Sequence, residues 1–207
     1  MAMSDYTELQ ASILKWLWRT GDTDTTAFVP DMIELAEAYF NRKLRVRDME
    51  AVADSGSTTV TNGVASLPSD FRAVISVRET TYEHYQITPK PMDELERFED
   101  ITSGRLCYYD VLGGEMHFWP RVTTTVRLRY LQSIPDLAAN TTNWLLTKHP
   151  DAYLYQSLVC GEAFNMNDVR VAMWKAKADM AIDQIEQEDV HLHQDALTPT
   201  VSTGVAV

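Results

Sequence analysis

The spacing of the apolar residues changes twice along this chain of 207 residues, and that change restricts the fold more than any other feature. From Tyr6 to about Arg47, and again after Pro150, apolar residues recur at intervals of three and four, which predicts amphipathic helices. From Met49 to Tyr130 they recur at every second residue, which predicts strands. The sequence therefore predicts an α+β fold with helices at both ends and strands in the middle.

Two helices are expected in the first part of the chain. Asp5 and Glu8 have the spacing of a capping box ahead of the first helix, which is expected to end near Gly21. A polar loop should follow. The second helix is predicted to begin at Pro30, because proline suits the first position of a helix, and to run to about Arg47.

The middle of the chain carries two turn signals. Asn62-Gly63 predicts a hairpin between residues 58–60 and 64–66, and Gly113-Gly114 predicts another between residues 105–111 and 115–119. Further elements are predicted on spacing alone: a strand over residues 73–77, a short helix over residues 92–99, and a strand over residues 126–130 with Arg127 and Arg129 on a wet face.

The last part of the chain is expected to hold a helical hairpin. A polar loop over residues 135–147, which carries Trp144, should lead into a helix from Pro150 to Phe164 and a second helix over residues 168–189. The expected organisation is a discontinuous helical bundle of residues 1–48 and 148–190, with a small antiparallel β subdomain of residues 49–147 inserted in it. Residues 191–207 are expected to form a flexible tail.

The charge of the chain limits its partners. A formal net charge of −12 and a pI near 4.7 argue against tight retention of nucleic acid, because such binding needs Lys and Arg opposite the phosphates. DNA could still pass nearby without sticking. No run of about 18 apolar residues occurs, so no membrane-spanning helix is expected. The N-terminus lacks the features of a signal peptide, and Cys107 and Cys160 are expected to be reduced, buried thiols.

No catalytic or metal-binding set emerges from the residues. His191 and His193 stand between Asp189 and Asp195, but no third ligand is fixed by spacing, so a solvated helix end is favoured over a metal site. Five acids crowd the last helix and are expected to form a solvated face: Asp179, Asp183, Glu186, Glu188 and Asp189. Hydrolase, nucleotide-binding and zinc-protease signatures are absent, so no enzyme activity, cofactor or metal is expected.

Interaction residues are easier to find than catalytic ones. The one notable cationic cluster consists of Arg42, Lys43, Arg45 and Arg47. It could touch DNA phosphates, but contact with an adjacent subunit, or pairing with acidic neighbours at a helix end, is favoured. The five tryptophans exceed what one small core can enclose, which makes Trp144 a candidate interface anchor together with Trp16 and Trp18.

Three blocks of sequence stand in order along the chain. They are IELAEAYFNRKLRVRDME after a short first helix and loop, then LPSDF with RLCYYDVLGGEMHFWP, then RLRYLQSIPDL running into NWLLTKHPDAYLY. Together they resemble the head-to-tail adaptor proteins of tailed phages, the tail tubular A-like connectors. The resemblance implies a ring, usually of twelve subunits, between the portal protein and the tail or nozzle protein, with double-stranded DNA passing through the central channel.

This resemblance leads to the functional hypothesis. The chain is expected to be a structural subunit of the virion neck, assembled in the cytoplasm of the host bacterium and not bound to a membrane. Two alternatives stay open at this stage. One is an enzyme of the tail, either a peptidoglycan hydrolase using acidic residues or a metal-dependent nuclease using His191 and His193. The other is a monomeric assembly chaperone that is absent from finished particles.

Overall fold

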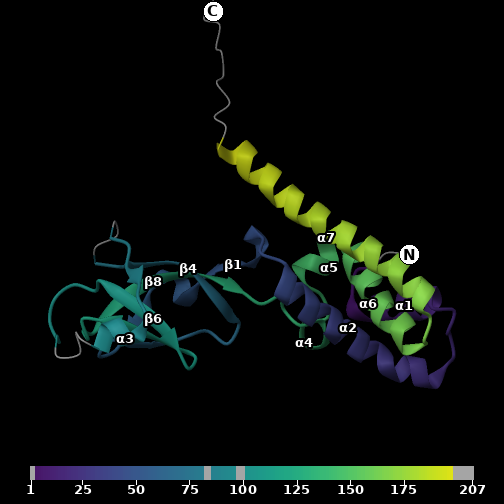
Figure 1. The fold of residues 1–207 in the computed structure, drawn as a ribbon, viewed down its shortest axis with the longest axis horizontal. Coiled ribbons are helices and arrows are strands. Elements are labelled where there is room, and N and C mark those ends of the chain that lie inside the picture. Colours follow the sequence, from purple (N-terminus) through teal and green to yellow (C-terminus); the bar gives the residue numbers. More distant parts are fainter. Residues whose placement is uncertain (1–2, 82–84, 97–100, 198–207) are drawn as a thin grey trace, which may run out of the picture. The chain divides into compact units, whose positions relative to one another are not determined.

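The structure, a computed structural model, describes residues 3–81, 85–96 and 101–197. The α+β class predicted from the sequence is confirmed, because helices and mainly antiparallel strands make up the chain. The chain divides into two compact units, Met1–Asp48 with Ile134–Val207, and Met49–Ser133. We call them the helical unit and the β unit after the elements that Figure 1 shows in each.

The first helix, α1 (Tyr6–Trp16), begins where the sequence predicted. The side chain of Asp5 accepts a hydrogen bond from the backbone N–H of Glu8 at 2.8 Å, which satisfies one of the free donors at the helix start. The helix ends at Trp16, earlier than the expected Gly21. Trp18 adopts a φ of 57°, a left-handed conformation that cannot continue a right-handed helix.

The second helix, α2 (Thr23–Lys43), begins a full two turns before the predicted start at Pro30. The carboxylate of Asp22 caps it by accepting hydrogen bonds from the backbone N–H groups of Asp24 at 3.1 Å and Thr25 at 3.4 Å. This cap outweighs the preference of proline for a first position, and Pro30 lies inside the helix. The predicted end near Arg47 was also wrong, because the backbone is already extended at Leu44.

The segment after the β unit belongs to the helical unit and is not the single polar loop that the sequence predicted. It contains two short helices, α4 (Leu137–Asn140) and α5 (Trp144–Lys148). The side chain of Asn143 accepts a hydrogen bond from the backbone N–H of Leu146 at 2.9 Å and so caps α5. Buried leucines fix both helices to the unit, which is why the boundary lies at Ile134 and not after residue 147.

The helical hairpin at the end of the chain consists of α6 (Pro150–Phe164) and α7 (Asp168–Leu197). The bounds of α6 agree with the prediction. In contrast, α7 continues through His191, which the sequence placed in a tail, and its yellow C-terminal turns run past the other helices of the unit (Figure 1). Residues 198–207 of the predicted flexible tail lie outside the described residues.

The centre of the helical unit is α6. It packs against α1, α2, α5 and α7, and Tyr153, Leu154 and Leu158 on it are buried. Gly161 permits a close approach to the neighbouring helices, since a Cβ there would lie 2.9 Å from Cδ1 of Leu17. The low polarity of α6 thus reflects contact on several sides, as expected for a central helix.

A buried polar network joins α2 to the returning chain. Oε1 of Glu37 accepts hydrogen bonds from the backbone N–H of Leu137 at 2.9 Å and from the hydroxyl of Tyr153 at 3.3 Å. The amide of Asn143 donates to the Tyr153 hydroxyl at 2.7 Å and to the carbonyl of Pro135 at 2.8 Å. Because buried polar groups are costly when unpaired, this network fixes how α2, α4, α5 and α6 meet.

In the β unit, one antiparallel sheet is organised around β8 (Thr124–Gln132). The long strand β4 (Phe71–Glu79) pairs with one edge of β8, while β1 (Glu50–Val52) and β2 (Thr58–Val60) share the other edge. Val126, Leu128 and Tyr130 of β8 are buried between exposed arginines, which confirms the predicted alternation.

The second sheet has the order β3-β7-β6-β5. The Gly113-Gly114 turn joins β6 (Tyr108–Leu112) to β7 (Glu115–Trp119), as predicted, and both glycines have positive φ. A single deviation from the expected antiparallel pairing occurs at β5 (Thr88–Pro89), which runs parallel to β6. The short helix after Pro91 is α3 (Met92–Leu95), and residues 97–99 of its predicted range lie outside the described residues.

The Asn62-Gly63 turn forms, but the hairpin predicted from it does not extend into a ladder. The strand before the turn, β2, enters the first sheet, and the strand after it, β3 (Val64–Ser66), enters the second. Gly63 lies where the two sheets meet, since a Cβ there would be 2.8 Å from the carbonyl oxygen of Phe118. Both sheets contribute to one apolar core that includes Val60, Val77, Met116 and Phe118.

The placement of Pro30 inside α2 can be tested by substitution. Pro30→Ala is expected to raise the free energy of unfolding by about 1–3 kcal/mol, because the new N–H can bond to the carbonyl of Thr26 and the ring clash disappears. Pro150→Ala is the matched control. Pro150 is the first residue of α6, where the missing N–H costs nothing, so no gain is expected. Urea unfolding followed by far-UV circular dichroism measures both, and equal effects would contradict this placement.

The network around Glu37 predicts a pH dependence of stability. Burial, with the nearby charge of Asp136, raises the pKa of the Glu37 carboxyl from its ordinary value of 4.5 to about 7. The folded protein therefore holds this proton more tightly than the unfolded chain does. The resulting stabilisation is complete below pH 4.5 and is lost as the pH rises to about 7, by up to about 3 kcal/mol.

Glu37→Gln keeps an acceptor oxygen but cannot titrate. The difference in unfolding free energy between this variant and the wild type is expected to change between pH 4.5 and 7, as measured by urea titrations at several pH values. Glu34→Gln, on an exposed position of the same helix, is the control for the loss of a carboxylate from α2. If the difference in unfolding free energy between Glu37→Gln and the wild type does not change with pH, the raised pKa of Glu37 is contradicted.

Candidate interaction surfaces

The basic residues at the end of α2 divide into three exposed side chains and one engaged side chain. Arg42, Lys43 and Arg45 are exposed, and they flank Leu44, which is fully buried. Among the described residues no ion pair is formed by these three cations. The buried side chain of Leu44 fixes the backbone of this segment, and the three charged groups therefore extend from it into solvent.

Arg47, the fourth predicted residue of this cluster, is bound within the chain. Its Nε lies 3.0 Å from Oδ1 of Asp189, and its Nη2 donates to the backbone carbonyl of the same residue at 3.0 Å. Arg47 thus holds the end of α2 against α7, which is a structural task. Arg47 therefore has a partner within the chain, unlike the exposed Arg42, Lys43 and Arg45.

Trp144 is placed at the first position of α5 and is only partly exposed. Its indole Nε1 is buried and has no hydrogen-bond partner among the described groups. The side chain therefore packs mainly onto its own unit, and only part of it is available to another protein.

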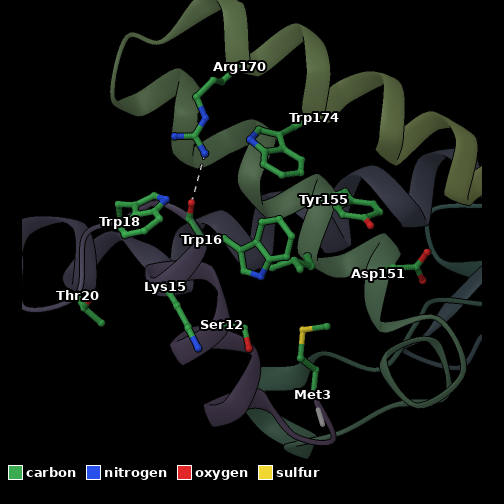
Figure 2. Close-up of a pocket in the computed structure, with 11 residues that line it drawn as sticks. Met3, Ser12, Lys15, Trp16, Trp18, Thr20, Asp151, Tyr155, Arg170 and Trp174 are labelled. Carbon is green, nitrogen blue, oxygen red and sulfur yellow. Dashed lines mark hydrogen bonds between the residues drawn. The ribbon is translucent and has the colours of Figure 1, made fainter. Parts of the chain in front are cut away.

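A larger candidate surface lies on the helical unit beside the end of α1. An open hollow of about 940 Å³ is formed there by side chains from α1, α6 and α7, and we call it the aromatic groove. Figure 2 shows Trp16, Tyr155 and Trp174 gathered on one side of the hollow and Trp18 beyond them. The sequence alone indicated the surplus of tryptophan but not this meeting of three helices.

The aromatic side chains of the groove are ordered by contacts with one another. The rings of Tyr155 and Trp174 are stacked with centroids 5.9 Å apart, and Trp16 meets Trp174 edge to face at 5.5 Å. Trp174 is buried, whereas 44% of Trp16 is exposed. A fixed aromatic floor with an exposed rim is a common basis for binding another protein.

Trp18 is the most unusual residue of the groove. It is 86% exposed and has a φ of 57°, in a position just after a helix where glycine is usually found. Both features are unfavourable for a bulky apolar residue in the isolated chain. Strain and exposure at one residue indicate a functional position.

Cations surround the groove. The Nζ of Lys177 lies 5.1 Å from the ring centre of Trp174 and 5.5 Å from that of Tyr155, within the range of cation–π attraction. The Nη2 of Arg170 donates to the carbonyl of Trp16 at 3.3 Å, shown as a dashed line in Figure 2, and its Nε lies 2.9 Å from Oε1 of Glu162. Asp151 also lines the hollow, so the groove is aromatic and carries charges of both signs. Lys15 and Lys177 are its two cations for which the described residues show no carboxylate partner.

The sequence predicted that the five acidic residues of α7 form a solvated face. The structure contradicts this prediction for two of them. Asp179 accepts a hydrogen bond from the hydroxyl of Tyr39 at 3.0 Å, and Asp189 pairs with Arg47. These two carboxylates join α7 to α2. Asp183 and Glu188 are exposed, as expected.

The described residues contain no group of three or more His, Cys, Asp and Glu side chains arranged to hold a metal ion. His191 lies on α7, and the side chain of His193 is outside the described part of the chain. Cys107 and Cys160 are free thiols, as predicted, but both are half-buried, whereas the sequence predicted that they are buried. Burial raises the pKa of the Cys160 thiol. None of the described helices combines the length and apolar character that spanning a membrane requires.

The sequence matches the family described as SU10 adaptor protein over residues 4–201. No curated protein matches the chain. The family match covers both units, including the exposed cations of α2 and the aromatic groove. The chain belongs to the SU10 adaptor protein family and is a phage adaptor protein, a component of the virion.

Proposed function

We propose that this protein is a subunit of a closed ring, of twelve copies, that connects the portal protein of the capsid to the tail. The match to the phage adaptor family over residues 4–201 carries this proposal. The resemblance of three sequence blocks to tail tubular A-like connectors supports the finer assignment. Assembly takes place in the host cytoplasm, and the protein then stays in the neck of the particle.

Genomic DNA passes through the channel of this ring without being retained. The formal net charge of −12 supports this part of the proposal, because a largely acidic wall repels phosphates and leaves few sites for counterion-releasing contacts. The chain thus acts by shape and by contact with other proteins, and it has no catalytic step of its own.

Arg42, Lys43 and Arg45 contact a neighbouring subunit in this ring. Their exposure and the lack of an ion pair for them among the described residues support that role, while the acidic balance of the chain offers many partners on a second copy. Trp144 contributes the exposed part of its ring to the same kind of contact.

Electron microscopy of the protein co-expressed with its portal protein tests the proposal. A ring attached to the portal is expected, and protein analysis of purified virions should find the chain in finished particles. A monomer that stays unbound in the presence of portal would contradict the connector, and absence from virions would favour an assembly chaperone instead.

Reversal of the exposed cations tests their part in the ring. Arg42→Glu with Arg45→Glu is expected to reduce the fraction of portal complexes that carry a ring by about tenfold, because like charges then face each other across the subunit contact. Arg78→Glu with Arg127→Glu reverses two exposed cations of the β unit, which is the same change of charge, and is the control. Rings formed equally well by both variants would show that the end of α2 is not a contact.

A further inference from the structure

The two parts of α7 carry opposite charges. Arg170, Lys175 and Lys177 lie in its first ten residues, and from Asp179 to Asp189 the helix has five acids and no Lys or Arg. The helix dipole acts on the first and last turns, and Lys175, Lys177 and the five acids lie outside both turns. Charges of opposite sign are therefore separated along α7, and only Lys175 and Asp179 are four residues apart and so able to pair within the helix.

The basic part of α7 belongs to the aromatic groove. Lys177 stands over the rings of Trp174 and Tyr155, which line the hollow. Lys15, which is exposed, lines the hollow as well, and so does Asp151 (Figure 2). Exposed Trp16 and Trp18 add apolar area at the rim. A ligand that fits this groove must offer acidic groups together with apolar side chains.

The later part of α7 offers that chemistry. Asp183, Glu186 and Val190 line a shallow depression on its outer face. Two exposed apolar residues lie on the same face, with exposed fractions of 62% for Met180 and 52% for Val190. We call this face the acidic ridge; it consists of Met180, Asp183, Glu186, Gln187, Val190 and His191.

Contacts within the chain leave carboxylates of the ridge available to another protein. Asp179 is bonded to Tyr39 and Asp189 to Arg47, but no ion pair or hydrogen bond is described for Asp183 or Glu186. Groove and ridge also cannot meet within one copy. Their centres are about 13 residues apart on one continuous helix, or about 20 Å, so the ridge cannot fold back onto its own groove.

We infer that the acidic ridge of one subunit docks into the aromatic groove of the next. This inference rests on the ring that we propose above and names the surfaces that close it. Two different, complementary patches on the same chain form a head-to-tail contact, which generates a ring when the rotation closes. Carboxylates of the ridge meet Lys15 and Lys177, and the apolar residues of the ridge cover Trp16 and Trp18.

Two charge-reversed variants test the contact. The groove variant carries Lys15→Glu and Lys177→Glu, and the ridge variant carries Asp183→Lys and Glu186→Lys. Each is expected to reduce rings on the portal by about tenfold or more, because two patches of like charge then meet. Far-UV circular dichroism of the purified subunits checks that both variants fold.

Mixing gives the decisive result. In an equimolar mixture every reversed groove can face a reversed ridge when the two variants alternate, so rings should return. One chain that carries all four substitutions should form rings by itself for the same reason. Failure of both the mixture and the four-fold variant to restore rings, or normal rings from either two-fold variant alone, would overturn the inference.

These outcomes are separate from failure of the proposed function. If the wild type forms no ring with portal, the connector itself is wrong, whereas rings that ignore the groove and ridge substitutions remove only this contact. Mixing the ridge variant with Arg42→Glu and Arg45→Glu gives a further discrimination. Restoration of rings by that mixture would mean that the ridge faces the end of α2, and it would overturn the groove as its partner.

Trp18→Gly separates docking from folding by effects of opposite sign. Glycine adopts positive φ without strain, so the thermal midpoint of the isolated subunit should rise. Loss of the exposed indole should at the same time lower the fraction of portal complexes with a ring. A rise in midpoint with an unchanged ring yield would contradict the role of Trp18 in docking.

Discussion

The helical unit depends on the hydrogen bonds that Glu37 makes deep inside it. Its carboxyl joins the backbone of Leu137 and the hydroxyl of Tyr153, residues that lie 100 and 116 positions further along the chain. The unit is assembled from two separate stretches, so local helix propensity alone cannot hold it together. Apolar contacts supply most of the free energy, but they are not directional. The network supplies direction, since each buried donor and acceptor in it is satisfied only when α2, α4, α5 and α6 are in register.

The surfaces of the helical unit contrast with that interior. Inside, the polar groups around Glu37 are paired, and the aromatic rings of Phe40 and Tyr153 pack edge to face at 5.1 Å. Three features of the surface have no partner that accounts for them among the described residues. They are the strained Trp18, the exposed cations Arg42, Lys43 and Arg45 at and just after the end of α2, and the separated charges of α7. In the ring that we propose, these features have a common explanation, because each becomes favourable when another protein covers it. Partners would then complete the surface of the helical unit, whereas its core is complete in the single chain.

Sequence reasoning succeeded where one local signal acted without competition. The Gly113-Gly114 turn, the alternation in β8 and the start of α6 at Pro150 each follow from such a signal. It failed where two signals competed, as at α2, where the cap at Asp22 overrode Pro30. It also failed where partners are remote in sequence. The Asn62-Gly63 turn forms, but long-range pairing sends its two strands into different sheets. The aromatic groove is a case of the same kind, because Trp16, Tyr155 and Trp174 meet only through tertiary packing.

The chain leaves the helical unit after Asp48 and returns to it at Ile134. Both crossings are anchored there: Asp48 by Lys148, at 2.7 Å, and the backbone N–H of Ile134 by the side chain of Asn41, at 2.9 Å. The intervening residues have an apolar core of their own. Substitutions that repack this core act on residues of the β unit alone. The sequence of residues 49–133 can therefore vary without matching changes in the interior of the helical unit.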